Sequence, residues 1–339
     1  MKVIECGPQD AGEWDDFVKR SDGTYCHLFG WKAVFERAYS LKTLYLAFHS
    51  GGEWAGVLPL AITPHLPGRP RKAISLPYCN YGGIVAAPGI DINTLRGSAL
   101  RYLSQQGVCS VEFRDRSDEC GGSGEVSLLL ALPATSTDLW NQLGPKVRNL
   151  IRKAQTYDLS IRWGADQAHD LYDIYAVKMG ELGTPVHSRR FIKEILLDLE
   201  GRADILTVRA QQKAIAAMLL IRFGQTWIDP FAASLPEFKA KNPNMLLYWE
   251  ALRAACDAQA QTFDFGRSYR DSGTYRFKRQ WGAQEVGLSY YSYCDGKLSR
   301  AAATDFYRGR SASVLAKVWR GLPLGIQRRL GPLLRRWIP

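Results

Sequence analysis

The sequence predicts an α/β (α+β) fold arranged as two tandem domains, each with a mixed, mostly antiparallel sheet flanked by helices. Length is the first observation, because 339 residues with 46% hydrophobic side chains exceed what one compact domain usually holds. Repetition is the second. Both halves of the chain run through a helix pair, antiparallel strands, a helix and a strand, which is typical of a duplicated unit.

The first half begins with a strand, KVIEC, and two helices in which apolar residues recur every three or four positions, around Trp14 and through Trp31. LKTLYLAFHS and AGVLPLAIT are predicted to form a hairpin with GGEW as its turn, because glycine supplies the positive φ that a tight turn needs. A loop, PHLPGRPRK, precedes SLPYCNYGGIVA. A helix that stops at Gly107 and a buried strand, CSVEFRD, complete this half, and DECGGSGE is a surface loop before the strand SLLLALP.

The second half repeats this order. Helices are predicted at LYDIYAVKMGELG, RRFIKEILLDL and MLLYWEALRAACDAQA, and strands at ADILTVRA, AIAAMLLIRF, TWIDPFAAS, TFDFG and GLSYYSYCD. Between the halves we expect a basic helix, LWNQLGPKVRNLIRKAQ, which Pro145 breaks or kinks. The predicted organisation is therefore a first domain over 1–136, a basic connector helix over 137–160, a catalytic domain over 161–300 and a basic amphipathic tail over 301–339.

The charge balance predicts an anionic partner. The net charge is +11, and from Arg308 onward the chain carries eight Lys or Arg residues and no acidic residue. The first residues contain no apolar signal core, and no run of about eighteen apolar residues is present. We therefore expect a cytoplasmic location, with peripheral contact at the inner membrane left open. The seven scattered cysteines suggest reduced thiols and no metal site.

The densest chemical signal is FDFGRSYRDSGTYRFKRQWGA, over 263–283. Gly266 permits unusual backbone angles, and cations on a loop after a strand suit a developing oxyanion or a phosphate. The polar and basic residues in this stretch are Arg267, Ser268, Arg270, Arg276, Lys278 and Arg279. The alternative is that the aromatic residues here, Trp281 included, are core while the cations form a solvated face.

Weaker candidates for a functional site occur in the first half of the chain. Asn80 and Tyr81 precede a glycine pair that would let the backbone approach a ligand, although a plain β-turn explains the same letters. Glu112 and Arg114 end a buried strand, where charged residues either pair with each other or face a cleft.

Two further residues in the second half attract attention. Asp229 interrupts an apolar strand and could orient an amine or act as a base, and a turn carboxylate before Pro230 is the alternative. His187 is the most chemically attractive histidine, although a lone loop histidine is more often structural.

Several motifs are absent. The chain contains no R-x-x-G-x-G/A pyrophosphate loop, no G-x-x-x-x-G-K-[ST], no G-x-S-x-G and no H-E-x-x-H. The sequence thus disfavours a standard CoA site, a P-loop nucleotide site, a serine hydrolase and a zincin.

The spaced segments NYGGIVA, LGTPVHSRRF, NMLLYWEALRAA and FDFGRSYRDSGTYRFKRQWGA resemble the FemAB-like proteins associated with exosortase/PEP-CTERM loci of Gram-negative bacteria. The resemblance covers nearly the whole chain. These proteins are similar, more distantly, to the FemABX aminoacyltransferases, which use aminoacyl-tRNA to attach amino acids to the peptidoglycan stem peptide.

This resemblance implies two GNAT-like domains and acyl transfer to an amine by direct attack on an activated ester. Lys278 occupies the place of the lysine in the Fem "FK" motif, which stabilises the reacting carbonyl, and Asp264 and Gly266 match the preceding strand end. Glu112 lies where Fem enzymes place an acidic strand end near the acceptor, and Asp229 replaces an expected glutamate. The motifs add Asn244, Tyr248, Arg267, Ser268, Arg276 and Trp281 as substrate-binding candidates, beside Asn80, Tyr81, Arg114 and His187.

The expected function is acyl or aminoacyl transfer to an amine-bearing precursor of the cell envelope, an exopolysaccharide or peptidoglycan. The donor would be aminoacyl-tRNA, acyl-CoA or an acyl carrier thioester, with no tightly bound cofactor. No long heptad run matches the coiled-coil arm of some Fem enzymes, so tRNA use does not carry over directly. The alternative is a non-catalytic assembly factor whose tail docks at a membrane surface, with Pro323 and Pro332 breaking that tail into short helices. The tail could instead pack back on a domain.

Overall fold

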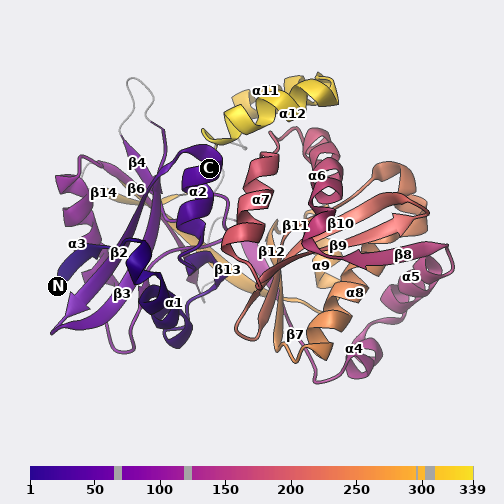
Figure 1. The fold of residues 1–339 in the computed structure, drawn as a ribbon, viewed down its shortest axis with the longest axis horizontal. Coiled ribbons are helices and arrows are strands. Elements are labelled where there is room, and N and C mark those ends of the chain that lie inside the picture. Colours follow the sequence, from indigo (N-terminus) through magenta and orange to yellow (C-terminus); the bar gives the residue numbers. More distant parts are fainter. Residues whose placement is uncertain (65–70, 118–123, 295–296, 302–309, 339) are drawn as a thin grey trace. The chain divides into compact units, whose positions relative to one another are not determined.

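The computed structural model describes residues 1–64, 71–117, 124–294, 297–301 and 310–338 (Figure 1). The predicted loops PHLPGRPRK and DECGGSGE lie mostly outside these residues. The chain divides into two compact units. Unit 1 comprises Met1–Ser123, Gly287–Phe306 and Arg336–Pro339, and unit 2 comprises Gly124–Val286 and Tyr307–Arg335.

Unit 1 is built on a sheet with the strand order β1-β2-β3-β4-β6-β13, in which β14 also pairs with β13 and β5 with β3. The pairings are antiparallel, apart from a parallel pair formed by β4 and β6. The strands are β1 (Lys2–Glu5), β2 (Lys42–Ser50), β3 (Glu53–Ile62), β4 (Lys72–Ile74), β5 (Val85–Ala86), β6 (Ser110–Ser117), β13 (Gln284–Cys294) and β14 (Lys297–Ala301). The helices are α1 (Ala11–Arg20), α2 (Trp31–Tyr39) and α3 (Ile92–Gln105).

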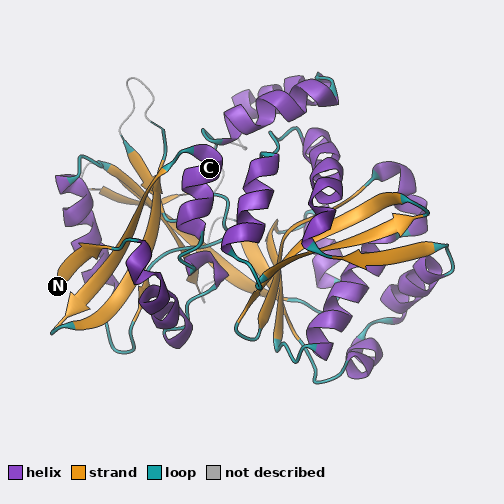
Figure 2. Ribbon diagram, in the orientation of Figure 1, coloured by secondary structure: helices purple, strands orange, loops and turns teal. Residues whose placement is uncertain are grey.

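Helices cover both faces of the unit 1 sheet (Figure 2). Successive residues of β2 point to opposite faces, as the geometry of a strand requires. Leu46 belongs to the buried cluster that includes Leu95 of α3. Tyr45, its neighbour, packs instead against Trp14 of α1, with ring centroids 5.0 Å apart. Unit 1 is therefore a helix, sheet and helix sandwich.

Unit 2 repeats this plan with the strand order β7-β12-β11-β10-β9-β8. Its pairings are also antiparallel, with one parallel pair formed by β11 and β12. The strands are β7 (Glu125–Ala131), β8 (Leu159–Trp163), β9 (Ala203–Ala210), β10 (Lys213–Phe223), β11 (Thr226–Ser234) and β12 (Thr262–Tyr269). The helices are α4 (Ser136–Gln142), α5 (Pro145–Gln155), α6 (Ala168–Leu182), α7 (Arg189–Asp198), α8 (Pro243–Asp257), α9 (Gly273–Arg279), α11 (Arg310–Gly321) and α12 (Leu324–Arg335).

The segment expected to connect the domains is part of unit 2. Its helix breaks at Pro145 as predicted, giving α4 and α5. Leu139, Val147 and Ile151 are buried in the same cluster as Leu252 of α8, because apolar residues four apart line one face of a helix. Residues 137–160 therefore do not form a separate connector, and the division at Ser123 differs from the boundary expected near 136.

Some local predictions need correction. The turn of the first hairpin is only Gly51 and Gly52, because Glu53 already pairs with Ser50. The tail forms two helices separated near Pro323, but α12 continues through Pro332. Proline removes its own N–H donor and crowds the carbonyl four residues earlier, so a helix continues past it only when the surrounding packing compensates.

Candidate active site in unit 2

A β-bulge in β12 organises the polar centre of unit 2. The pairing of β12 with β7 shifts register between Asp264 and Arg267, and Gly266 has a φ of 71°, a conformation that glycine adopts without strain. The fully buried Asp264 carboxylate accepts hydrogen bonds from the Gly266 backbone N–H (2.7 Å) and from the Ser127 hydroxyl of β7 (2.9 Å). These two bonds hold the bulge in place.

The bulge presents two backbone carbonyls to a buried lysine. Lys278 lies near the end of α9, which begins at the N-cap Ser272. Its Nζ donates to the carbonyl oxygens of Gly266 (3.1 Å) and Arg267 (3.0 Å), and the residue is only 8% exposed. An ammonium group has three N–H donors. One donor of Lys278 is therefore left over from this pair of bonds.

Asp229 of β11 is the second buried ionisable group of the cluster. Its Oδ2 accepts a hydrogen bond from the Tyr248 hydroxyl of α8 (2.5 Å), and its buried Oδ1 has no hydrogen-bond partner among the described residues. Burial raises the pKa of Asp229 to about 8, although the charge of Lys278 and the Tyr248 hydrogen bond act in the opposite direction. Burial likewise lowers the pKa of Lys278, against the effect of Asp229 and Asp264.

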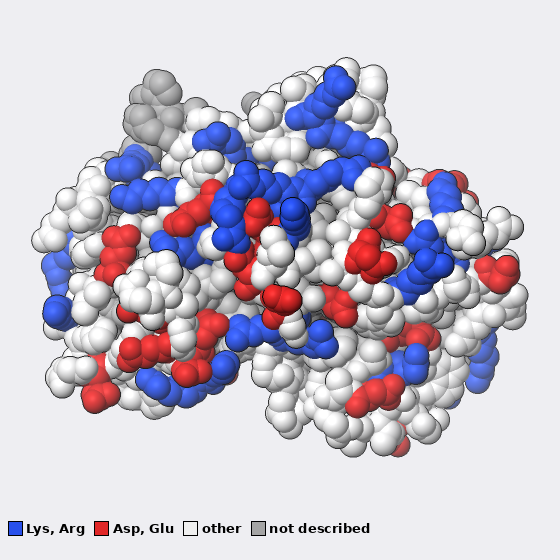
Figure 3. Space-filling view, viewed as in Figure 1, with Lys and Arg blue, Asp and Glu red and all other residues white. Residues whose placement is uncertain are grey.

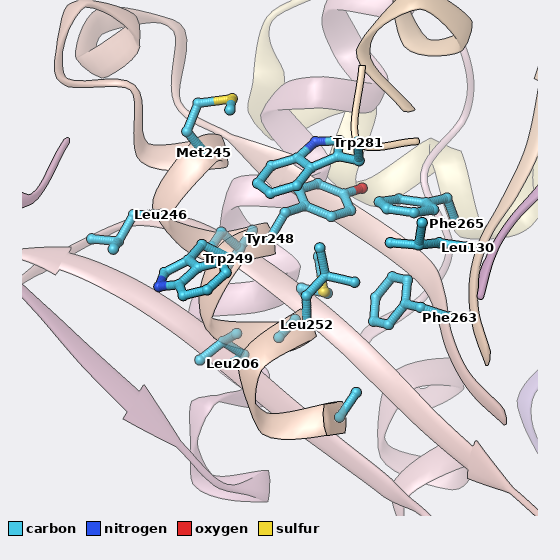
Figure 4. Packing of buried hydrophobic residues seen from close by; sticks show 14 of the residues in the cluster. Leu130, Leu206, Met245, Leu246, Tyr248, Trp249, Leu252, Phe263, Phe265 and Trp281 are labelled. Carbon is cyan, nitrogen blue, oxygen red and sulfur yellow. The ribbon is translucent and has the colours of Figure 1, made fainter. Parts of the chain in front are cut away.

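The Tyr248 hydroxyl that binds Asp229 belongs to an aromatic cluster in which Tyr248, Phe265 and Trp281 lie close together (Figure 4). Tyr248 stacks on Phe265 with ring centroids 5.5 Å apart, and the ring centroids of Trp281 and Tyr248 are 6.2 Å apart. The Trp281 indole N–H and the Ser268 hydroxyl are buried without a hydrogen-bond partner in the part of the chain that the structure describes. Buried polar atoms of this kind are ordinarily satisfied by water or by a ligand. The expectation that Trp281 is simply core accounts for its ring but not for its N–H group.

The basic segment is not the single loop that the sequence predicted. Strand β12 continues through Tyr269 because the bulge at Gly266 lets it bend, so Arg267 and Ser268 lie on a strand and Lys278 on a helix. Arg267 lies 3.8 Å from the buried carboxylate of Glu125. Arg276 is exposed and donates to the Asp271 carbonyl (2.7 Å).

Asn244 and His187 occupy different positions in unit 2. Asn244 lies half-buried in the first turn of α8. The buried His187 ring stacks on Phe191 with centroids 4.4 Å apart and packs on Phe231, and burial and Arg335 lower its pKa well below the usual value. This environment is that of a core histidine, the structural alternative raised from the sequence.

The first-half candidates form a separate network in unit 1. Glu112 accepts from Lys72 Nζ (2.6 Å) and from Arg114 Nε (2.8 Å), while the Arg114 guanidinium also lies over the Tyr290 ring. Burial alone would raise the pKa of Glu112, but the charges of Arg114 and Lys72 lower it to about 2. Of the two readings of this strand end, pairing is the one the structure shows. A carboxylate with this pKa is a poor proton acceptor at neutral pH.

Asn80 and Tyr81 also make contacts within unit 1. The Asn80 carbonyl accepts from the Tyr290 hydroxyl, and the Arg116 guanidinium lies over the Tyr81 ring at 5.5 Å. The glycine that follows them at 83 packs so closely on Asp115 that a Cβ would lie 1.7 Å from its Oδ1. The glycine pair therefore serves close packing of the chain on itself.

Sequence reasoning did not single out Ser127 and Glu125. Both lie on β7, which the sequence shows as an apolar strand with two polar residues near its start. Polar residues two apart on a buried strand point to the same face. That alternation was the available signal, and only the pairing of β7 with β12 places both residues beside the bulge.

Comparison with known proteins agrees with this architecture. Residues 145–279, from α5 to α9, match the family described as "Acetyltransferase (GNAT) domain". The crystal structure of FemX superposes with a TM-score of 0.68 at 15% identity, covering 87% of this chain and 98% of FemX. A tandem GNAT protein from the clavulanic acid biosynthesis pathway gives 0.55 at 12% identity, covering 87% of this chain and 99% of that protein. L-PGS from Bacillus licheniformis gives 0.54 at 9% identity, covering 94% and 98%.

No curated protein matches the sequence. The structural likenesses nevertheless define the class of fold: the chain has the tandem GNAT architecture, and FemX shares it over most of its length. The prediction of two tandem GNAT-like domains with mixed sheets is thereby confirmed.

Proposed function

We propose that the protein is an acyltransferase that moves an acyl or aminoacyl group from an activated ester or thioester to an amine. The observation that carries this proposal is the buried pair of Asp229 and Lys278 in unit 2. A carboxyl group with a pKa of about 8 exchanges its proton near neutral pH, and a buried ammonium stabilises negative charge that develops beside it.

In the proposed reaction, the neutral acceptor amine attacks the carbonyl carbon of the donor, and the carboxylate form of Asp229 takes a proton from the attacking nitrogen as the C–N bond forms. The remaining N–H of Lys278 stabilises the oxyanion of the tetrahedral intermediate. Collapse of this intermediate breaks the bond from carbon to the leaving oxygen or sulfur. The proton held by Asp229 passes to that leaving atom, which restores the starting enzyme.

Tyr248 and the bulge hold the two groups in position. The Tyr248 hydroxyl orients the carboxyl of Asp229, and the carbonyls of Gly266 and Arg267 fix the ammonium of Lys278. Preorganised groups of this kind are effective because no reorganisation is required when charge develops.

The donor in this proposal is aminoacyl-tRNA or an acyl thioester such as acyl-CoA. The match of residues 145–279 to the GNAT family supports an acyl donor, and the fold shared with FemX and L-PGS supports an aminoacyl one. Lys146, Arg148, Arg152 and Lys153 of α5 supply positive charge suited to either phosphate-rich molecule. An amine-bearing cell-envelope or exopolysaccharide precursor is the proposed acceptor, and it rests on the resemblance to exosortase-associated FemAB-like proteins.

The test is a binding and turnover screen of the purified protein. Native mass spectrometry and thermal shift would be recorded with total tRNA, aminoacyl-tRNA, acyl-CoAs and nucleotide sugars, followed by release of free CoA or uncharged tRNA in the presence of amine acceptors. We expect one donor class to bind and to be consumed by the wild-type protein.

The matched variants are Lys278→Met and Lys193→Met, which place the same substitution at the buried lysine and at an exposed lysine of α7. Turnover lost only in Lys278→Met supports the proposal. Equal turnover in both variants would remove Lys278 from the mechanism, and the absence of any donor binding would favour the non-catalytic assembly factor.

A further inference from the structure

The C-terminal helices form a hairpin that is locked by one glutamine. Helix α11 ends at Gly321 and α12 begins at Leu324. The buried Gln327 amide of α12 donates to the carbonyls of Trp319 (2.9 Å) and Leu322 (2.8 Å) at the end of α11. Carbonyls at a helix end need such partners, so the angle between the two helices is specified by side-chain contacts.

One face of this hairpin is fixed on unit 2. Gly331 packs so closely on Val186 that an added Cβ would lie 3.0 Å from its backbone N. On the same helix, Arg328 forms an ion pair with Asp173 of α6 (3.2 Å), and Arg335 Nε lies 3.2 Å from Nε2 of the buried His187. The tail therefore packs back on unit 2. These contacts determine which face of the hairpin points to solvent.

The outward face is apolar, contrary to the usual pattern of a surface helix. Val318 is 61% exposed and Leu333 is 62% exposed. The other large apolar side chains exposed on the two helices are Val314, Leu315, Ile326, Leu330 and Leu334. In α12 the spacing 326, 330, 333 and 334 places them on one helical face. An exposed apolar row of this length marks an interaction surface.

Positive charge borders this apolar row. Figure 3 shows Lys and Arg side chains gathered over α11 and α12, and the sequence from Arg310 to Pro339 contains no Asp or Glu. Lys317 and Arg329 are exposed, and Arg320 is exposed beside them. Each helix is far too short to cross a bilayer, and no helix within the described ranges meets the length and apolar content of a membrane span.

We propose that the outward face of the α11–α12 hairpin docks the protein on an anionic phospholipid surface. Leucine and valine side chains would enter the boundary between head groups and acyl chains, while the bordering cations contact lipid phosphates. A nucleic acid would use the cations but leave the aliphatic row exposed to water. A membrane uses both features, which is why we commit to it. The inference does not depend on the acyltransferase activity.

Vesicle flotation of the full chain tests this proposal. Wild-type protein would be mixed with vesicles of phosphatidylcholine alone or with phosphatidylglycerol, at low and high salt. The test variant is Val318→Gln with Leu333→Gln, and the control is Leu197→Gln with Leu298→Gln, which makes the same kind of change at leucines of similar exposure elsewhere. Neither pair alters charge.

We expect strong binding to the anionic vesicles only, a loss of at least about tenfold in the test variant and none in the control, since each lost apolar contact weakens interfacial binding. Arg329→Gln should weaken binding by about fivefold at low salt. Circular dichroism would verify that each variant is folded. Equal flotation of test and control variants overturns the proposal. So does a dimer, seen by light scattering, that the test variant abolishes while vesicle binding stays absent.

Discussion

Glu112 in unit 1 and Asp229 in unit 2 are both buried carboxyl groups on a strand of their unit's parallel pair, β4–β6 and β11–β12, yet their pKa values shift in opposite directions. Glu112 has two cations within 2.8 Å, and its pKa falls to about 2. Asp229 has a tyrosine hydroxyl as the partner of Oδ2 and none for Oδ1 among the described residues, and its pKa rises to about 8. Burial alone therefore does not predict a buried carboxylate's role, because the number of cations that hydrogen-bond to it decides the sign of the shift.

The two units thus share an architecture but differ in how their buried ionisable groups are paired. In unit 1, Glu112 pairs with Lys72 and Arg114 across β4 and β6. In unit 2, at β11 and β12, the described residues provide no partner for Asp229 Oδ1, and the two hydrogen bonds of Lys278 to the bulge carbonyls use two of its three N–H donors. Incomplete satisfaction of buried polar groups is a mark of functional sites.

The largest effect that tests this comparison is a loss of folding stability, and it is expected at Glu112. Glu112→Gln should lower the free energy of unfolding by about 3–5 kcal/mol at neutral pH, because it leaves the buried Arg114 without its anion. The pKa of Glu112 is lowered on folding, so its contribution is present above its ordinary pKa of 4.5 and is lost as pH falls through about 2. Denaturant melts at several pH values would check this, and a variant as stable as wild type at pH 7 contradicts it.

The next effect is expected on turnover at Lys278. Lys278→Met should reduce kcat by about 10²–10³-fold, equivalent to about 2.7–4 kcal/mol of barrier, because an oxyanion donor is removed. Single-turnover kinetics with the donor identified by the binding screen would measure it. A change confined to KM would instead assign Lys278 to ground-state binding.

Asp229→Asn should change the pH dependence of both the free energy of unfolding and kcat/KM. The pKa of Asp229 is raised on folding from 3.8 to about 8, so its favourable contribution is present below pH 3.8 and is lost as pH rises through about 8. The wild-type free energy of unfolding should fall across this window by at most about 1.4 kcal/mol per pH unit, and the variant should show a smaller slope. The variant should also lose the rise of kcat/KM near pH 8. Parallel unfolding curves would show that Asp229 is not the titrating group.

The smallest effect is expected at Ser127. Ser127→Ala removes the hydroxyl hydrogen bond to Asp264 and should cost about 1–3 kcal/mol of stability, with a several-fold loss of turnover if the bulge shifts. Ser289→Ala, a buried serine of unit 1 whose hydroxyl has no partner in the described structure, is the matched control and should be nearly neutral. Equal losses in both variants would mean that the Asp264 contact carries no special weight.

The sequence predicted the fold better than the site. The repeated order of helices and strands follows from local periodicity, and the elements form as expected, but two strands belong to the other unit. SLLLALP, expected in the first domain, forms most of β7 in unit 2, and GLSYYSYCD, expected in the catalytic domain, forms most of β13 in unit 1. Lys278 and Asp229 attracted attention as charged residues in apolar surroundings, and the structure brings both into one electrostatic cluster. The bulge at Gly266 was not predictable, because it depends on pairing with β7, more than one hundred residues earlier in the chain.

The expected connector helix and the expected tail also show that tertiary contacts could not be predicted from the sequence. The basic helix and the tail were set apart by their charge, but charge describes the exposed face of a helix and not its buried one. Leu139 and Val147 of the expected connector enter the core of unit 2, and Gly331 of the tail packs on Val186. Which element covers an apolar face is a tertiary property that composition does not specify.

The division of the chain also has a consequence for how the protein folds during synthesis. Unit 1 needs residues Gly287–Phe306, which leave the ribosome only after the whole of Gly124–Val286. Until β13 emerges, β6 has an open edge on that side, and unpaired strand edges favour aggregation. Residues 1–123 therefore wait for β13 while the whole of 124–286 is made, and a stop codon near residue 286 would leave that edge exposed permanently.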